Sequence, residues 1–221
     1  MNWINKDTEI YCSFAEKAGN TGCQMMNSAF YYCGLNKIYK SFSVDNIQDA
    51  VAAVRALDIK GFAVTMPYKK KVLEYVDSIE EKTEKIGAAN TVINNNGILT
   101  AYNTDYLSAK SFLEGVFRER EYSGFYILGS GGYANAVKQA AADINKEYIN
   151  INRNDWGKIN TITDSLVFNC TPVVDISSEI SLTNQFIDCI VTTPTGRALA
   201  LAQASHQFKM YTGLEFPFNR K

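Results

Sequence analysis

A glycine-rich turn between an apolar run and an alanine-rich run is the feature of this sequence that points most directly to chemistry. Phe125-Tyr126-Ile127-Leu128 is typical of a buried strand, and it runs into Gly129-x-Gly131-x-x-Ala134, after which a helical pattern begins. In this context the chain turns tightly, its backbone can approach a pyrophosphate, and the helix N-terminus offers free N–H groups to the anion. The turn therefore predicts a dinucleotide site, with an ordinary strand-to-helix turn as the alternative.

The residues after the next strand bear on which dinucleotide would bind. Tyr148-Ile149-Asn150-Ile151 is expected to form a strand that ends near the adenosine ribose, where an acidic residue would bind a 2′-hydroxyl and an arginine a 2′-phosphate. The chain has Asn152-Arg153 at this place. Because a guanidinium matches the geometry of a phosphate, NADP is favoured over NAD. An exposed arginine that binds nothing is the alternative.

Three further polar side chains follow strand-like segments in the first half of the chain. Lys69 comes just after Val64-Thr65-Met66-Pro67-Tyr68, where we expect a helix to open, while Asn90 and Asp105 follow two other strands. They are therefore candidates to converge at one place. The alternative is that Lys69 belongs to a solvated run, Lys69-Lys70-Lys71, and that Asn90 and Asp105 cap helices.

The elements that must position these residues alternate between strand and helix, the pattern of an α/β layer structure. Asp45 is expected to cap a helix that ends before Asp58, and 61–65 to form a short buried strand. Asn-Gly at 96–97 predicts a hairpin between the strands 91–93 and 98–102. Residues 103–105 are expected to cap a long helix to about Arg118 that connects two domains, and a last helix is expected from Ala198 to about Met210.

The composition excludes several classes of function. The chain has 221 residues with 22 Lys and Arg against 23 Asp and Glu, so it offers no basic field for nucleic acid or an anionic membrane. No apolar run approaches the roughly 20 residues that cross a bilayer, and the first residues lack the order of a secretory signal, so we expect a cytoplasmic protein. Five cysteines without Cys-x-x-Cys spacing favour reduced thiols over zinc or disulfides, and the single histidine, His206, is expected on the surface. No metal site is expected.

Several segments together resemble the shikimate dehydrogenase family, and most closely its shikimate-dehydrogenase-like branch. They occur in the family's order and cover most of the chain, most densely from Gly61 to Asp105. The matching segments are 64–69, 86–92, 102–105, 128–132, 152–153, 169–172 and the closing stretch from Gly196 to Gly213.

The resemblance implies an NADP-dependent enzyme that reversibly reduces 3-dehydroshikimate to shikimate, or acts on a close cyclitol acid such as quinate, in aromatic amino acid biosynthesis. It implies an N-terminal α/β substrate domain, residues 1–106, on which the C-terminal helix, 197–221, packs back. A shortened Rossmann-type NADP-binding domain would comprise residues 107–196. The small-molecule substrate would be the main partner, and a homodimer is one way to cover the edge that a shortened sheet exposes.

The family's residue roles transfer to matching positions. Lys69 and Asp105 would form the catalytic pair beside the reacting oxygen, where an ammonium can stabilise developing charge and deliver a proton. The residues that would contact the substrate are Ser13, Asn20, Thr65, Asn90 and Gln203. Those that would contact NADP are Gly129, Ser130, Gly131, Gly132, Tyr133, Asn152, Arg153 and Thr171.

The sequence also departs from the family in two places. The family's serine pair that holds the substrate carboxylate is missing from the stretch 20–27, where Ser13 and Asn20 are the substitutes that we expect. Few residues separate Arg153 from Asn169, so the cofactor domain is short. These departures keep open a second hypothesis, a binding or regulatory protein that retains the fold but has little dehydrogenase activity. A weaker third is another lysine-assisted NADP dehydrogenase, such as one acting on folates.

Overall fold

The computed structural model describes residues 4–218 and divides them into two compact units. The first comprises the residues up to Thr104 together with those from Ala204 onward, and the second comprises Asp105–Gln203. One boundary lies at the start of a helix and the other lies within the last helix. The sequence-based boundaries, after residues 106 and 196, differ from these, and the assignment of substrate and cofactor roles to the two domains stays a prediction.

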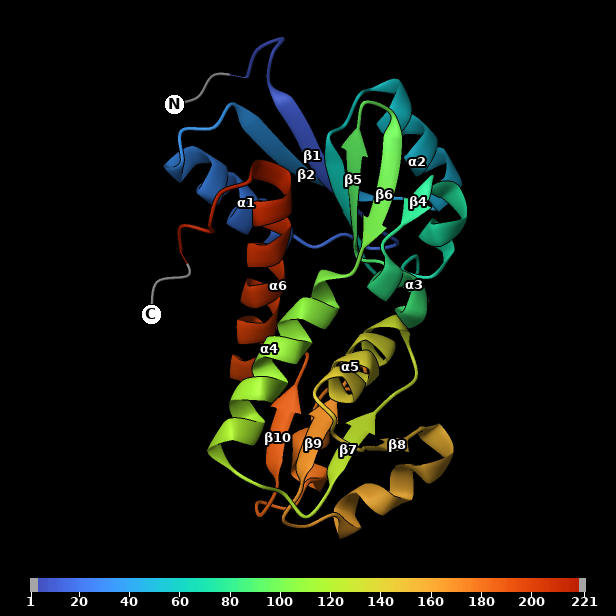
Figure 1. The fold of residues 1–221 in the computed structure, drawn as a ribbon, viewed down its shortest axis with the longest axis vertical. Helices are drawn as coiled ribbons and strands as arrows, with labels where there is room; N and C mark the ends of the chain where they lie inside the picture. The colour runs from blue at the N-terminus through green and yellow to red at the C-terminus, as the bar shows by residue number, and fades with distance from the viewer. Residues whose placement is uncertain (1–3, 219–221) are drawn as a thin grey trace. The chain divides into compact units, whose positions relative to one another are not determined.

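The first unit contains a six-stranded mixed sheet in the order β2-β1-β3-β5-β6-β4 (Figure 1). Parallel pairing joins β1 to β2 and β3, and β4 to β6, whereas β5 is antiparallel to both of its neighbours. The strands are β1 (Glu9–Ala15), β2 (Lys37–Ser43), β3 (Gly61–Val64), β4 (Ser78–Ile79), β5 (Thr91–Asn95) and β6 (Ile98–Tyr102). The helices are α1 (Thr21–Tyr32), α2 (Ile47–Ala56), the 3₁₀ helix η1 (Lys71–Tyr75) and α3 (Glu81–Ile86).

Two apolar layers cover the faces of this sheet. On one face, Ile47, Val51 and Val54 of α2 pack in a buried cluster with residues of β1, β3, β5 and β6. On the other face, the ring of Phe30 of α1 lies 5.6 Å from that of Tyr11 and 5.7 Å from that of Phe208. Phe208 belongs to α6 (Pro194–Thr212), so the second half of this helix completes the core of the first unit.

The hairpin predicted from Asn96-Gly97 is confirmed. The two residues join β5 to β6 with φ values of 52° and 90°, both in the left-handed region that a two-residue type I′ turn requires. Glycine adopts this conformation without steric cost, and asparagine tolerates it better than most residues. The turn fixes the register that places Thr91 opposite Tyr102 at the other end of the hairpin.

Four local predictions were wrong. The N-cap of α2 is Asn46, whose side chain accepts a hydrogen bond from the Gln48 N–H, and not Asp45. No α-helix begins at Lys69; the chain forms turns there, followed by the 3₁₀ helix η1. The last helix begins at Pro194 instead of Ala198, since proline is favoured in a first helical turn. His206 is half-buried rather than on the surface.

The second unit contains a four-stranded, wholly parallel sheet in the order β10-β9-β7-β8 (Figure 1). The strands are β7 (Phe125–Leu128), β8 (Ile149–Ile151), β9 (Leu166–Asn169) and β10 (Gln185–Asp188). The helices are α4 (Thr104–Glu119), α5 (Gly132–Asp143), and the 3₁₀ helices η2 (Arg153–Thr161) and η3 (Ile176–Glu179). The fold is thus α/β, with a doubly covered parallel sheet in the second unit.

Both faces of the parallel sheet are buried, as βαβ connections require. Phe125 of β7 contacts Phe117 of α4, and Tyr133 of α5 contacts Phe168 of β9, so α4 and α5 cover one face. Ile159 of η2 and Ile176 of η3 pack with Leu128 and Val167 against the other. Among residues 4–218, no helix is both long and apolar enough to cross a membrane.

Candidate functional site

The glycine turn lies at the carboxyl end of β7, the edge of a parallel sheet where ligands bind in α/β folds. Gly129 has φ +111°, a conformation that other residues rarely adopt, and a Cβ there would lie 3.0 Å from Cγ2 of Thr171. Gly131 caps α5, and a Cβ at this position would meet no atom within 4 Å. Of these two glycines, only Gly129 is required by its backbone conformation, and the missing side chain at position 131 leaves open space at the N-terminus of α5.

Thr171 is brought next to this turn by hydrogen bonds at the end of β9. Its N–H and its hydroxyl both donate to Oδ1 of Asn169, at 2.9 and 2.7 Å, and Nδ2 of Asn169 donates to Oδ1 of Asp188 at 3.1 Å. Asn169 is fully buried, which makes this arrangement rigid. Of the predicted cofactor residues, the structure therefore brings Gly129 and Thr171 into direct proximity.

Asn152 and Arg153 follow β8, the neighbour of β7. Asn152 caps η2 by accepting from the Asn154 N–H at 2.9 Å, and Arg153 is the exposed first residue of η2. The backbone N–H of Gly129 donates to the Ile151 carbonyl at 2.9 Å, which ties the glycine turn to the end of β8. Asn150 adds two bonds from its Nδ2, to the carbonyls of Ile127 and Gly129, both 2.8 Å.

Tyr133 and Asp105 share one neighbourhood in the second unit. Burial raises the pKa of the Tyr133 phenol well above its usual value, and the nearby Cys170 and Asp105 raise it further. The Asp105 side chain is itself buried, at 4 % exposed, as the second residue of α4. The carboxylate predicted as catalytic therefore lies beside the helix that begins at the glycine turn.

In the first unit, Lys69 lies on the loop between β3 and η1, and its side chain is half-buried. The Ala89 N–H donates to the Lys69 carbonyl at 2.7 Å, and the Val64 N–H donates to the Asn90 carbonyl at 2.9 Å. These two bonds hold the Lys69 loop against the segment that carries Asn90. The structure thus brings together two of the three residues whose convergence the sequence predicted, and the third, Asp105, belongs to the second unit.

Asn90 is the centre of a buried polar network. Its Oδ1 accepts from the Thr104 N–H at 2.8 Å and from the Thr91 hydroxyl at 3.0 Å, while its Nδ2 donates to Oγ1 of Thr104 at 3.0 Å. Nε2 of Gln207 donates to Oγ1 of Thr91 at 2.8 Å and to the Asn90 carbonyl at 3.3 Å. Asn90 thereby anchors the first residue of α4, whose next residue is Asp105.

The three residues predicted to bind the substrate carboxylate, Ser13, Asn20 and Thr65, differ in their exposure and in their hydrogen bonds. Ser13 of β1 donates to Oγ of Ser41 at 2.9 Å, and Sγ of Cys23 lies 3.1 Å from the same Ser41 oxygen. Asn20 is exposed just before α1 and its side chain makes no capping bond. Thr65 is exposed after β3, where its carbonyl accepts from the Tyr68 N–H at 2.9 Å.

Sequence reasoning missed three polar residues of these clusters. Gln207, Ser41 and Cys23 were not among the candidate site residues, although Gln207 lies one helical turn after Gln203 and shares its residue type. Gln203 itself is half-buried on α6 as the last residue of the second unit. Within the described residues, no three His, Cys, Asp or Glu side chains gather as a metal site would require.

Comparison with known proteins finds shikimate dehydrogenases both by family model and by individual relatives. The family model described as the shikimate dehydrogenase substrate binding domain matches residues 21–92. A shikimate dehydrogenase-like protein of Haemophilus influenzae is 39 % identical over 137 residues, covering 62 % of this chain and 50 % of the relative. A shikimate dehydrogenase (NADP(+)) of Pyrococcus furiosus is 38 % identical over 136 residues, covering 61 % and 50 %. The chain thus spans about half the length of these curated relatives.

The likeness of structure extends further along the chain than that of sequence. The solved structure of a shikimate 5-dehydrogenase-like protein matches with a TM-score of 0.81 and 28 % identity, covering 98 % of this chain and 96 % of the other. The sequence similarity is therefore concentrated in part of the chain, while the order of elements is shared over nearly all of it.

Proposed function

Since the chain is similar to shikimate dehydrogenases, we propose that it interconverts shikimate and 3-dehydroshikimate, with NADP as the cofactor. The observation that carries the proposal is the position of the buried Asp105 carboxylate beside Tyr133, at the edge of the parallel sheet where the glycine turn ends. This arrangement combines an ionisable group with a turn suited to a dinucleotide. Quinate is the closest alternative substrate.

The residues of the second unit fit a dinucleotide with a 2′-phosphate. The open space at Gly131 and the N–H groups at the N-terminus of α5 suit a pyrophosphate, and the exposed Arg153 after β8 suits the additional phosphate. Ser130, Gly132, Tyr133, Asn152 and Thr171 would complete the contacts. When bound, NADP supplies the acceptor or donor of the hydride.

Lys69 and Asp105 are proposed as the catalytic pair. Reduction of a ketone builds negative charge on its oxygen, and the Lys69 ammonium would stabilise this charge and deliver the proton. In the oxidation direction, the same amine would take the proton from the substrate hydroxyl. The Asp105 carboxylate would accept a hydrogen bond from a neighbouring substrate hydroxyl.

The remaining substrate contacts are proposed at the ends of the strands of the first unit. Asn90 has one Nδ2 hydrogen beyond the bond to Thr104 that could reach a hydroxyl. Thr65 and the Ser41 hydroxyl are the donors that we propose for the carboxylate, with Ser13 holding Ser41 through its own hydrogen bond and Asn20 at the rim. Gln203 would contact the ring from α6.

Replacement of Lys69 is the sharpest test of the proposal. Lys69→Ala should lower kcat for shikimate oxidation with NADP by about 10²- to 10⁴-fold, as loss of a general acid or base does, without changing the melting temperature. Lys70→Ala, the exposed next residue, is the matched control and should retain activity. An unchanged rate in Lys69→Ala would refute the catalytic assignment, and a wild-type protein inactive on both shikimate and quinate would refute the activity.

A second candidate function is a ligand-binding or regulatory protein without efficient chemistry. It is favoured by the small second unit, in which a sheet of four strands ends at the three-residue β8 and a 3₁₀ helix follows that strand. Calorimetry separates the two. Binding of shikimate and NADP with no turnover favours the binding protein, whereas turnover excludes it.

A further inference from the structure

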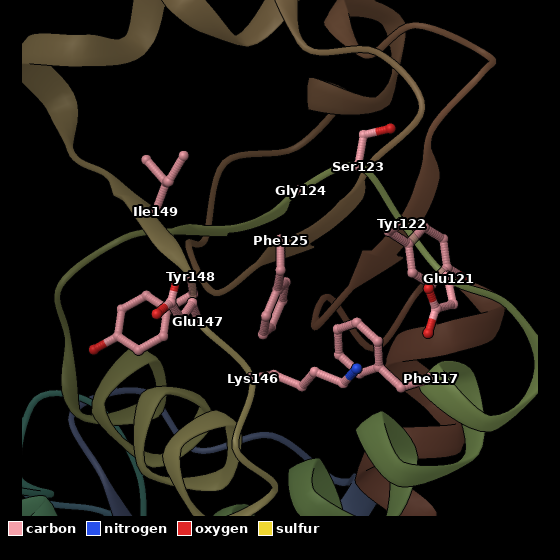
Figure 2. Close-up of a pocket in the computed structure, with 10 residues that line it drawn as sticks. All are labelled: Phe117, Glu121, Tyr122, Ser123, Gly124, Phe125, Lys146, Glu147, Tyr148 and Ile149. Carbon is pink, nitrogen blue, oxygen red and sulfur yellow. The ribbon is translucent and has the colours of Figure 1, made fainter.

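The second unit contains a pocket of about 350 Å³ at the amino ends of β7 and β8. It is formed by the end of α4, the segment 121–125 and the residues 146–149 that lead into β8 (Figure 2). The glycine turn follows the carboxyl end of β7, so the pocket lies at the opposite edge of the same sheet. Its volume is at the small end of the range for ligand pockets, which suits a molecule with a single ring.

Aromatic rings form the walls of this pocket. The centroid of the Phe117 ring lies 5.5 Å from that of Phe125 and 5.7 Å from that of Tyr122, both in edge-to-face contact. The centroid of the Tyr148 ring lies 6.5 Å from that of Phe125. In Figure 2, Phe117 and Tyr122 lie on one side of Phe125 and Tyr148 lies on the other. Rings arranged in this way favour another aromatic ring through offset or edge-to-face contacts.

Charges of both signs line the same pocket without compensating one another. Nζ of Lys146 lies 4.7 Å from the centroid of the Phe117 ring, and none of the ion pairs found among residues 4–218 includes it. Glu121 and Glu147 are exposed, and neither has a cationic partner in the described part of the chain. A ligand that carried only a carboxylate would meet two glutamates, and one that carried only an ammonium would leave Lys146 uncompensated.

We propose that this pocket binds a small zwitterionic aromatic molecule, namely a free aromatic amino acid. Its carboxylate would pair with Lys146, its ammonium with Glu121 or Glu147, and its ring would lie against Phe117, Phe125 and Tyr148. The inference uses only the pocket of the second unit, so it does not depend on the dehydrogenase proposal.

Calorimetric titration with four matched probes tests the chemical class. L-Phenylalanine should bind saturably at one site with a Kd of about 1 mM or below. Removing the ammonium (3-phenylpropionate), the carboxylate (phenethylamine) or the aromatic character (L-cyclohexylalanine) should each weaken binding about tenfold, equivalent to roughly 1.4 kcal/mol. Absence of saturable binding by L-phenylalanine up to about 10 mM, or equal affinity for all four probes, would overturn the proposal.

Substitution of Lys146 tests the location. Lys146→Met keeps most of the apolar stem, and it should weaken L-phenylalanine about tenfold while leaving phenethylamine unchanged. Lys158→Met, an exposed lysine of the same unit that pairs with Asp155, is the matched control and should bind as the wild type does. Unfolding of each variant followed by circular dichroism shows that the unit is intact. Equal affinity of Lys146→Met and wild type for L-phenylalanine would overturn the site.

Discussion

Asn90 is a residue whose side chain has a structural task as well as the proposed one in binding. Asn90→Ala would leave the buried Thr104 N–H without an acceptor and would remove the amide that bonds the buried hydroxyls of Thr91 and Thr104. Because each unsatisfied buried group costs about 1–3 kcal/mol, the free energy of unfolding should fall by roughly 2–4 kcal/mol. Urea denaturation measures this, with the exposed Asn95→Ala as control, expected within about 0.5 kcal/mol of wild type. A loss at Asn90 no larger than at Asn95 would contradict the network.

Arg153 is the residue that should decide between the two dinucleotides. Its guanidinium is exposed directly after β8, so Arg153→Ala should raise the KM for NADP about tenfold or more and leave that for NAD unchanged. Lys158→Ala, on the same 3₁₀ helix, controls for a general loss of positive charge. Initial rates with each dinucleotide provide the measurement, and a parallel rise in both KM values would refute a role in binding the 2′-phosphate.

At the scale of elements, two adjacent residues make a matched pair at the start of α2. Asn46 accepts from the Gln48 N–H at 2.9 Å, so Asn46→Ala should destabilise the protein by about 1 kcal/mol, the usual cost of a lost N-cap. Asp45→Ala removes the residue that the sequence favoured as the cap and should cost less than half as much. Chemical denaturation of both variants measures the difference. A larger loss in Asp45→Ala would mean that the helix begins one residue earlier.

The elements that sequence patterns predicted well are those whose local signal is strong. Asn96-Gly97 determines the hairpin of β5 and β6 because few other residues tolerate two successive left-handed conformations. Asp45 and Asn46 are equally good capping residues by type, so residue type alone does not decide between them. The apolar spacing after Met66-Pro67 did not distinguish a 3₁₀ helix from an α-helix, because one short turn contains too few residues to show a period.

The candidate site was predictable only where its residues have a local sequence signature. The glycine turn has a local signature, and the structure places it at the carboxyl end of β7 next to Thr171. The contacts of Gln207 with Asn90 and Thr91 join residues more than a hundred positions apart, and no spacing along the chain encodes them. The pairing of Ser13 with Ser41 depends on the register of two parallel strands, which the sequence does not specify.

At the scale of the whole molecule, the single histidine predicts how stability depends on pH. Burial of His206 on α6 lowers its pKa below the usual 6.5, so the unfolded chain binds a proton more readily than the folded one. The free energy of unfolding should therefore fall as the pH drops below about 6.5, and this loss is complete once the pH is below the folded pKa.

His206→Gln should remove the pH dependence of the free energy of unfolding between about pH 7 and 5. Glu9 acts at lower pH, because its hydrogen bond with Lys37 lowers the pKa of its carboxyl below the ordinary 4.5, and this stabilisation is lost only in more acidic solution. Urea denaturation at several pH values provides the measurement. Equal slopes for wild type and His206→Gln above pH 5 would show that another group controls the dependence.

Transfer of hydrogen between the two ligands tests the central proposal most directly. Shikimate carrying deuterium on the carbon that becomes the ketone is incubated with NADP and the protein, and mass spectrometry locates the label. We predict that the deuterium appears in the reduced nicotinamide of wild type and Lys70→Ala at comparable rates, and far more slowly with Lys69→Ala. Binding of both ligands by wild type with the label retained entirely in shikimate would contradict the dehydrogenase account.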